Sequence, residues 1–100
     1  MKKNIYGIID SRTHNFGDIC LLDRDEEFRD GCMNLFSNPD IPTYLLSDLE
    51  GYRYGSVTFD SDMLFPKFEI STPPVCVVYG ADAVLLRKDD VRRETVSENT

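Results

Sequence analysis

The clearest secondary-structure signal lies in residues 23–36, which read DRDEEFRDGCMNLF. Its apolar residues recur at i, i+4, i+7 and i+8, which places them on one face of an α-helix. These residues are Phe28, Cys32, Leu35 and Phe36. Acidic residues fill the first turn, where carboxylates interact favourably with the helix dipole. The segment therefore predicts an amphipathic helix that buries one face.

Both ends of this helix carry recognisable signals. Asp23 is the expected N-cap, because Glu26 follows three residues later in a D-x-x-E arrangement that resembles a capping box. Gly31 lowers the helix propensity by about 1 kcal/mol relative to Ala, and we interpret it as a mark of close packing against a sheet. The helix is predicted to end at Ser37-Asn38-Pro39.

Strand patterns flank the helix on both sides. The predicted strands are residues 5–10, 16–22, 52–59, 64–70 and 75–79. Pro66 makes the fourth an edge strand, and residues 39–50 form an ordered loop that is anchored in the core. The order strand–strand–helix–strand–strand–strand predicts an α+β fold: one antiparallel sheet of about five strands packed on a single helix. Residues 1–86 form a single domain, and residues 87–100 form a charged C-terminal tail.

Composition excludes several protein classes. The chain has 100 residues and a net charge of −7, and residues 87–100 contribute nothing to that charge because their basic and acidic side chains balance. No stretch reaches the roughly 18 apolar residues of a membrane span, and no apolar segment follows Lys2-Lys3 as in a signal peptide. The cysteines, Cys20, Cys32 and Cys76, include no CxxC pair and suit free buried thiols in a reducing cytoplasm.

Catalytic and metal-binding patterns are missing from the sequence. His14 is the one histidine, and it falls in a polar connection where it is interpreted as a solvated loop side chain. The four Cys and His residues are too scattered for a structural zinc site. We therefore predict no enzyme, no catalytic residues, no metal and no cofactor.

Aromatic residues are the one surplus, at 11% of the chain. In strand 52–59, period-two alternation places Tyr52, Tyr54, Ser56 and Thr58 on one face and Arg53, Gly55, Val57 and Phe59 on the other. Two tyrosines on one face could stack successive bases of single-stranded DNA, with phosphates bound by cations. The predicted nucleic-acid site comprises Tyr52, Arg53, Tyr54, Lys67 and Arg12. The alternative is that these tyrosines pack on the helix or in a dimer interface.

Two other interpretations need no DNA. The acidic helix residues Asp25, Glu26 and Asp30 could bind a viral or host replication protein, in the manner of a nucleic-acid mimic. Alternatively, free edge strands could pair two copies into a symmetric homodimer.

Short motifs along residues 4–83 make the chain similar to the small non-structural proteins of gokushoviruses, a branch of the single-stranded DNA microviruses. The opening strand ends in Asp, as in Ile5-Tyr6-Gly7-Ile8-Ile9-Asp10, and an acidic helix start, residues 23–28, precedes Arg29. A Pro- and Asp-containing loop and a Gly-containing strand follow, and the likeness ends at Gly80-Ala81-Asp82. The matching residues in this middle part are Pro39, Asp48, Gly55 and Asp60, with Pro74 opening the last part.

Two departures from that family pattern occur, at Gly31, where an aromatic residue is usual, and at Phe65-Pro66. The resemblance implies a phage accessory protein in the host cytoplasm that is associated with single-stranded genome replication or packaging. It implies no catalytic residues.

Overall fold

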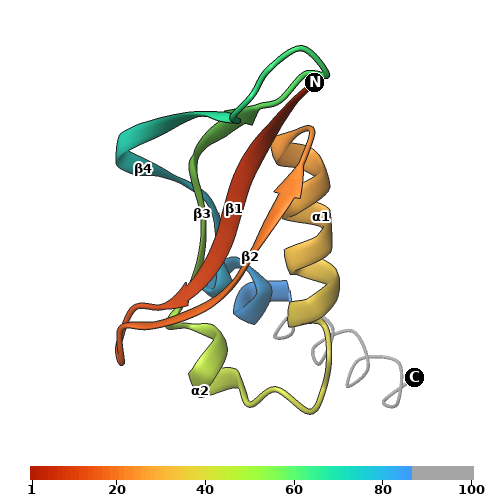
Figure 1. The fold of residues 1–100 in the computed structure, drawn as a ribbon. Helices are drawn as coiled ribbons and strands as arrows, with labels where there is room; N and C mark the ends of the chain where they lie inside the picture. The colour runs from red at the N-terminus through yellow and green to blue at the C-terminus, as the bar shows by residue number, and fades with distance from the viewer. Residues whose placement is uncertain (87–100) are drawn as a thin grey trace, which may run out of the picture.

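The computed structural model describes residues 1–86 and shows one antiparallel sheet with helices on one side (Figure 1). The elements are β1 (Lys2–Asp10), β2 (Asn15–Leu22), α1 (Asp25–Phe36), α2 (Thr43–Leu46), β3 (Leu49–Thr58) and β4 (Lys67–Tyr79). Residues 80–86 are helical. The strand order in the sheet is β2-β1-β3-β4, so β2 and β4 form its edges. The predicted tail, residues 87–100, lies outside the described residues.

The predicted amphipathic helix is confirmed. Phe28, Cys32 and Phe36 of α1 are buried, and the ring of Phe28 stacks on that of Tyr6 with centroids 4.5 Å apart. Leu35 differs from the expectation, because 48% of it is exposed. The core between α1 and the sheet is completed by Leu46, Val78 and Ala83, so the chain between α1 and β3 is anchored as predicted.

The start of α1 differs from the predicted capping box. The N-cap is Arg24, without a side-chain capping bond, and the carboxylate of Asp23 instead lies 2.8 Å from the Lys3 ammonium. Gly31 is also not a point of close packing, because a Cβ there would meet nothing within 4 Å. The close approach lies at Gly51, where a Cβ would stand 2.7 Å from the Phe28 ring.

The sheet has four strands instead of about five, and the helix is not single. The two strands expected at 64–70 and 75–79 are one strand, β4, which runs through Pro73 and Pro74. Pairing with β3 skips residues 71–74, since Ile70 lies opposite Gly55 and Val75 opposite Arg53. Prolines are tolerated there because β4 is an edge strand, as Pro66 led us to expect. The short helix α2 and helical residues 80–86 were not predicted.

The first two strands, both predicted, form a hairpin. β1 and β2 pair antiparallel, and the Asp10 carboxylate accepts hydrogen bonds from the backbone N–H groups of Arg12 and Thr13 in the turn. His14, also in this turn, has a φ of 57°.

A bulge in β3 changes the predicted alternation of its side chains. Gly7 of β1 lies opposite Tyr52 and Ile5 lies opposite Gly55, so β3 has one extra residue between these pairs. Directly opposed residues point to the same side of a sheet, so Gly55 and Val57 share the side of Tyr52, whereas Ser56 does not. Gly55 has a φ of 155°, and a Cβ there would lie 2.0 Å from the Glu69 carbonyl oxygen, so glycine is required.

Candidate functional site

The central residues of the predicted DNA site lie on opposite sides of the sheet. Tyr52 and Tyr54 point away from α1, and Tyr54 lies over Gly7 of the neighbouring strand. Arg53 points toward α1, where its Nη1 lies 2.5 Å from Oδ2 of Asp25. The cation that was expected to bind phosphate therefore joins β3 to the first turn of α1.

Asp25 likewise contributes to the packing of α1 on the sheet and not to an exposed acidic surface. Its Oδ1 accepts a 2.7 Å hydrogen bond from the hydroxyl of Tyr6, which is fully buried. Burial alone would raise the pKa of Asp25, but the hydrogen bonds from Tyr6 and Arg53 lower it below its ordinary value. Burial and the bond to Asp25 raise the pKa of Tyr6 to about 12. The predicted acidic surface is thus reduced to Glu26 and Asp30, both exposed.

The two tyrosines of the predicted stacking pair have different surroundings. The hydroxyl of Tyr52 donates a 2.5 Å hydrogen bond to Oε2 of Glu50, and this bond, with burial, raises the pKa of Tyr52. Burial raises the pKa of Tyr54 as well. Both side chains are half-buried, so neither ring stands fully free for a base.

The remaining predicted phosphate contacts do not form a strip. Lys67 begins β4 opposite Thr58, and its Nζ lies 3.9 Å from the carboxylate of Glu69. Arg12 lies in the β1–β2 turn, at the other end of β1 from the residue that pairs with Thr58. The structure therefore does not bring Lys67, Arg12 and Arg53 together.

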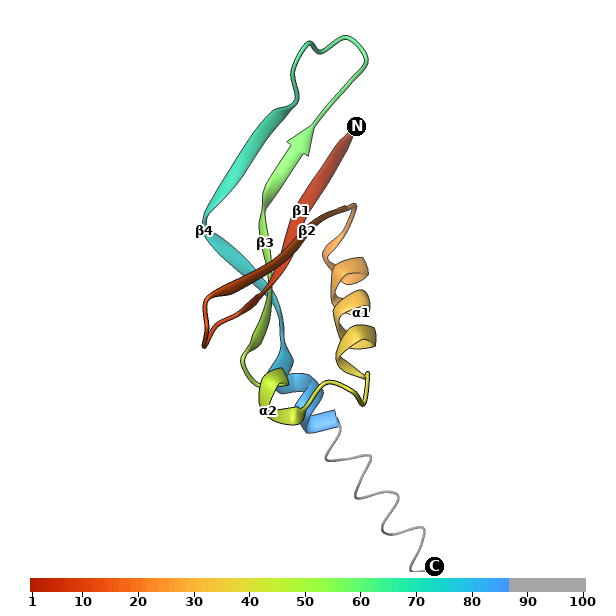
Figure 2. The same cartoon turned by 60° about the horizontal axis from the view of Figure 1, so that its bottom comes forward.

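A different surface of the sheet carries large, exposed apolar side chains. We call it the open face: the side of the sheet that points away from α1, which no described helix covers (Figures 1 and 2). Strand pairing places apolar side chains from all four strands on it. They are Ile5, Ile9, Phe16, Ile19, Leu21, Tyr52, Tyr54, Val57, Phe68, Ile70 and Tyr79.

Several members of the open face are well exposed. On β2, Phe16 is 73% and Ile19 66% exposed, and on β4, Ile70 is 66% exposed. Residues 16–22 and 64–70 were both predicted as strands, and in 64–70 period-two alternation places Phe68 and Ile70 on one side. In the structure no described helix covers that side, although Ile5 and Val57 at its centre are buried, and the sequence pattern could not show this.

One end of the open face continues into an apolar hollow. Leu21, Val57 and Phe68 contribute to it from the sheet, and Phe59, Asp60 and residues 63–66, between β3 and β4, line the rest. The hollow has a volume of about 410 Å³. Leu64 and Phe65 beside it are 86% and 75% exposed, so the apolar surface extends beyond the strands.

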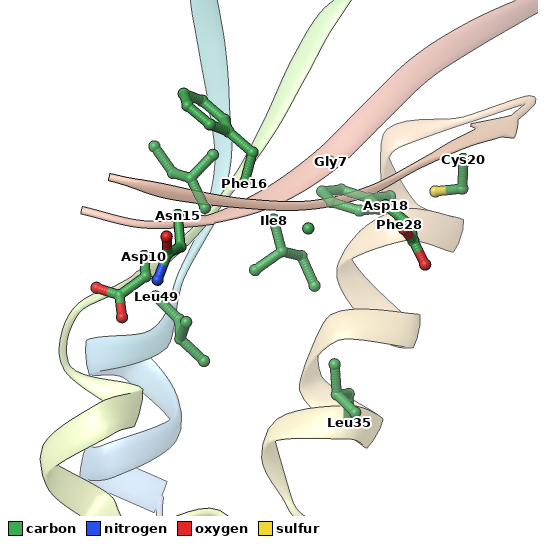
Figure 3. A pocket seen from close by; sticks show the side chains of 12 residues that line it. Gly7, Ile8, Asp10, Asn15, Phe16, Asp18, Cys20, Phe28, Leu35 and Leu49 are labelled. Atoms are coloured by element: carbon green, nitrogen blue, oxygen red, sulfur yellow. The ribbon is translucent and has the colours of Figure 1, made fainter. Parts of the chain in front are cut away.

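A second hollow lies on the other side of the sheet, between the hairpin and α1 (Figure 3). Ile8 and Leu49 project into it, whereas Phe16 points away from it and onto the open face. Its volume is about 490 Å³, and Asp10 and Asp18 are among its lining residues. Its lining is mainly apolar and lacks an arrangement of acid, base and nucleophile.

Within residues 1–86 no group of three or more His, Cys, Asp or Glu side chains could hold a metal ion. His14 is exposed in the hairpin turn, as expected for a loop side chain. Cys32 is a buried free thiol, where burial raises its pKa to about 11, but Cys20 is exposed.

The described helices include none that is long and apolar enough to cross a membrane. Comparison with known proteins finds no matching family model, no similar curated protein and no similar solved structure.

Proposed function

We propose that this protein is a non-enzymatic accessory module that binds protein through the open face of its sheet. The observation that carries the proposal is the exposure of large apolar side chains from both edge strands on one uncovered surface. Monomeric proteins rarely expose contiguous apolar patches larger than a few hundred Å², and larger patches are typical of interaction sites.

The distribution of charge favours protein over nucleic acid as the partner. DNA binding depends on the neutralisation of phosphates by Lys and Arg, and the net charge here is −7. Arg53 already pairs with Asp25, and Lys67 lies close to Glu69. Single-stranded DNA is the second candidate ligand, because Tyr52 and Tyr54 lie on the open face together.

The resemblance to gokushovirus non-structural proteins supports a biological setting for this module. We place it in the host cytoplasm, in association with single-stranded genome replication or packaging, where a viral or host replication protein is a candidate partner. Glu26 and Asp30, exposed on α1, offer a separate acidic surface on the opposite side of the sheet for such a partner.

Site-specific photo-crosslinking in bacterial cells tests the binding surface directly. A photo-crosslinking phenylalanine derivative replaces Ile19 on the open face or, as a control, Leu35 on α1. We expect protein adducts from position 19 and few from position 35, with the adducts identified by mass spectrometry. The proposal is wrong if position 19 gives no more protein adducts than position 35.

The DNA candidate has its own test, fluorescence anisotropy of a labelled oligonucleotide of about 30 bases at low salt. If DNA is the ligand, the joint change Tyr52→Ala and Tyr54→Ala weakens binding more than tenfold while circular dichroism stays unchanged. On the protein-binding proposal, the wild-type chain shows no salt-sensitive binding in this assay.

A further inference from the structure

We propose that the occupant of the open face is a second copy of this chain, which packs its own open face against the first. The result is a dimer in which two sheets stack face to face, with α1 on the outside of each copy. This inference rests on the proposed function and identifies the bound protein as a second copy of the chain.

The exposed area is close to what a stable dimer needs. Seven Phe, Ile and Leu side chains of the open face and the adjoining loop are at least 48% exposed. They are Phe16, Ile19, Leu21, Leu64, Phe65, Phe68 and Ile70. Each of them exposes on the order of 100 Å², so together they expose on the order of 700 Å² per copy. Specific interfaces bury about 800 Å² per partner.

The charges near the open face also suit a second copy. Lys3 and Asp23, at one end of the hairpin, neutralise each other, and Glu50 accepts the hydroxyl hydrogen bond of Tyr52. The face therefore presents little charge that could attract an oppositely charged partner. Its apolar chemistry is matched by the same face of another copy, and a two-fold interface needs this kind of self-complementary surface.

Pairing of sheet edges is a weaker explanation of the same surface. Both β2 and β4 have a free edge within the described residues, and edge pairing would satisfy their backbone groups. It would leave Phe16, Ile19 and Ile70 in water, however, because side chains stand perpendicular to the plane in which strands pair. Face-to-face packing at about 10 Å between sheets covers them.

Sedimentation equilibrium of the full chain and three variants tests the inference. Leu21→Lys and Leu35→Lys form a matched pair, because both leucines are 48% exposed and only Leu21 lies on the open face. Ile19→Lys adds a second change on the face, at a position 66% exposed, where we expect the folded monomer to accept Lys because its side chain can reach water. Circular dichroism and thermal melting establish that each variant folds.

We expect a wild-type dimer of twice the 11.5 kDa chain mass. Leu21→Lys and Ile19→Lys should weaken it at least tenfold, and Leu35→Lys should leave it within twofold. A wild-type chain that stays monomeric at high concentration overturns the inference, as does a dimer that resists both face variants, which would point to the edges.

Failure of this inference is distinguishable from failure of the proposed function. If the chain is monomeric but position 19 crosslinks to a different protein, the protein-binding face stands and the second copy is wrong. If the chain is monomeric and position 19 crosslinks to no protein, both are wrong.

Discussion

Asp25 holds together three elements that are distant in the sequence. It begins α1, accepts the hydroxyl hydrogen bond of Tyr6 from β1, and pairs with the guanidinium of Arg53 from β3. The pattern of the sequence assigned Asp25 and Arg53 to two rival binding sites. Their contact shows that both side chains stabilise the packing of the helix on the sheet, because a charge-assisted hydrogen bond forms there.

Replacement of Asp25 by Asn should therefore destabilise the fold. The change leaves the half-buried Arg53 without a counter-ion, and we expect a loss of about 1–2 kcal/mol in the free energy of unfolding, given partial solvent screening. Urea denaturation measures it. Asp30→Asn on the same helix is the control and should stay within about 0.5 kcal/mol of wild type, because Asp30 is exposed. Equal losses in both variants would show that the contact with Arg53 contributes nothing.

The same carboxylate predicts a pH dependence. The hydrogen bonds of Tyr6 and Arg53 outweigh burial and lower the pKa of Asp25 in the folded state. Its contribution is therefore complete above the unfolded pKa of about 3.9 and is lost as the pH falls through the folded pKa. We expect the difference in stability between wild type and Asp25→Asn to be constant near neutral pH and to shrink below about pH 4. A difference that persists unchanged in acid contradicts this assignment.

At the scale of elements, α1 packs against β3 through the Phe28 ring, at Gly51, where β3 carries no side chain. A Cβ on Gly51 would lie 2.6 Å from Cγ1 of Val78 and 2.7 Å from the Phe28 ring, so these two side chains fill the space over this glycine. Gly31, on the helix itself, has open space around it. Gly51 is therefore required for close packing, whereas Gly31 has no packing role.

Substitution by Ala distinguishes these roles. Gly51→Ala forces both neighbours to move and should cost about 1–3 kcal/mol of unfolding free energy, as overpacked cores do. Gly31→Ala adds a methyl group in free space within a helix and should stabilise the fold by about 0.5–1 kcal/mol. Thermal and urea unfolding of the two variants measure both signs. A stabilising Gly51→Ala would mean that α1 does not lie on β3 as described.

Local patterns explain which elements were predictable. The periodicity of residues 23–36 and the paired strands before it depend on neighbours in the chain, and both were predicted correctly. The continuity of β4 through Pro73 and Pro74 depends on its edge position, and the bulge at Tyr54 and Gly55 depends on the register with β1. Such long-range pairings leave no periodic signal.

The candidate site was less predictable than the fold for the same reason. The shared face of Tyr52 and Tyr54 follows from alternation and is confirmed in the structure. The pairing of Arg53 with Asp25 joins residues 28 positions apart and is invisible to local reasoning. Alternation in the edge strands indicates an apolar side, but it does not tell whether a second layer covers that side.

At the scale of the whole molecule, the strong negative net charge and the mainly apolar open face have opposite effects on self-association. Two copies with a net charge of −7 repel at a distance, whereas contact between their open faces is favourable. Salt shortens the range of the repulsion, from a Debye length of about 10 Å at 0.1 M to about 3 Å at 1 M, and leaves apolar burial intact. The two forces therefore respond differently to ionic strength.

The direction in which affinity changes with salt therefore distinguishes a second copy of the chain from single-stranded DNA as the ligand. Between about 0.05 and 0.5 M NaCl, dimerisation should become tighter by at least about twofold, because screening removes repulsion between like charges. Binding to single-stranded DNA must instead weaken over the same range, because it releases counter-ions. Sedimentation equilibrium and oligonucleotide anisotropy on one preparation measure both. Self-association that weakens with salt would show that ion pairs, and not the open face, hold the copies together.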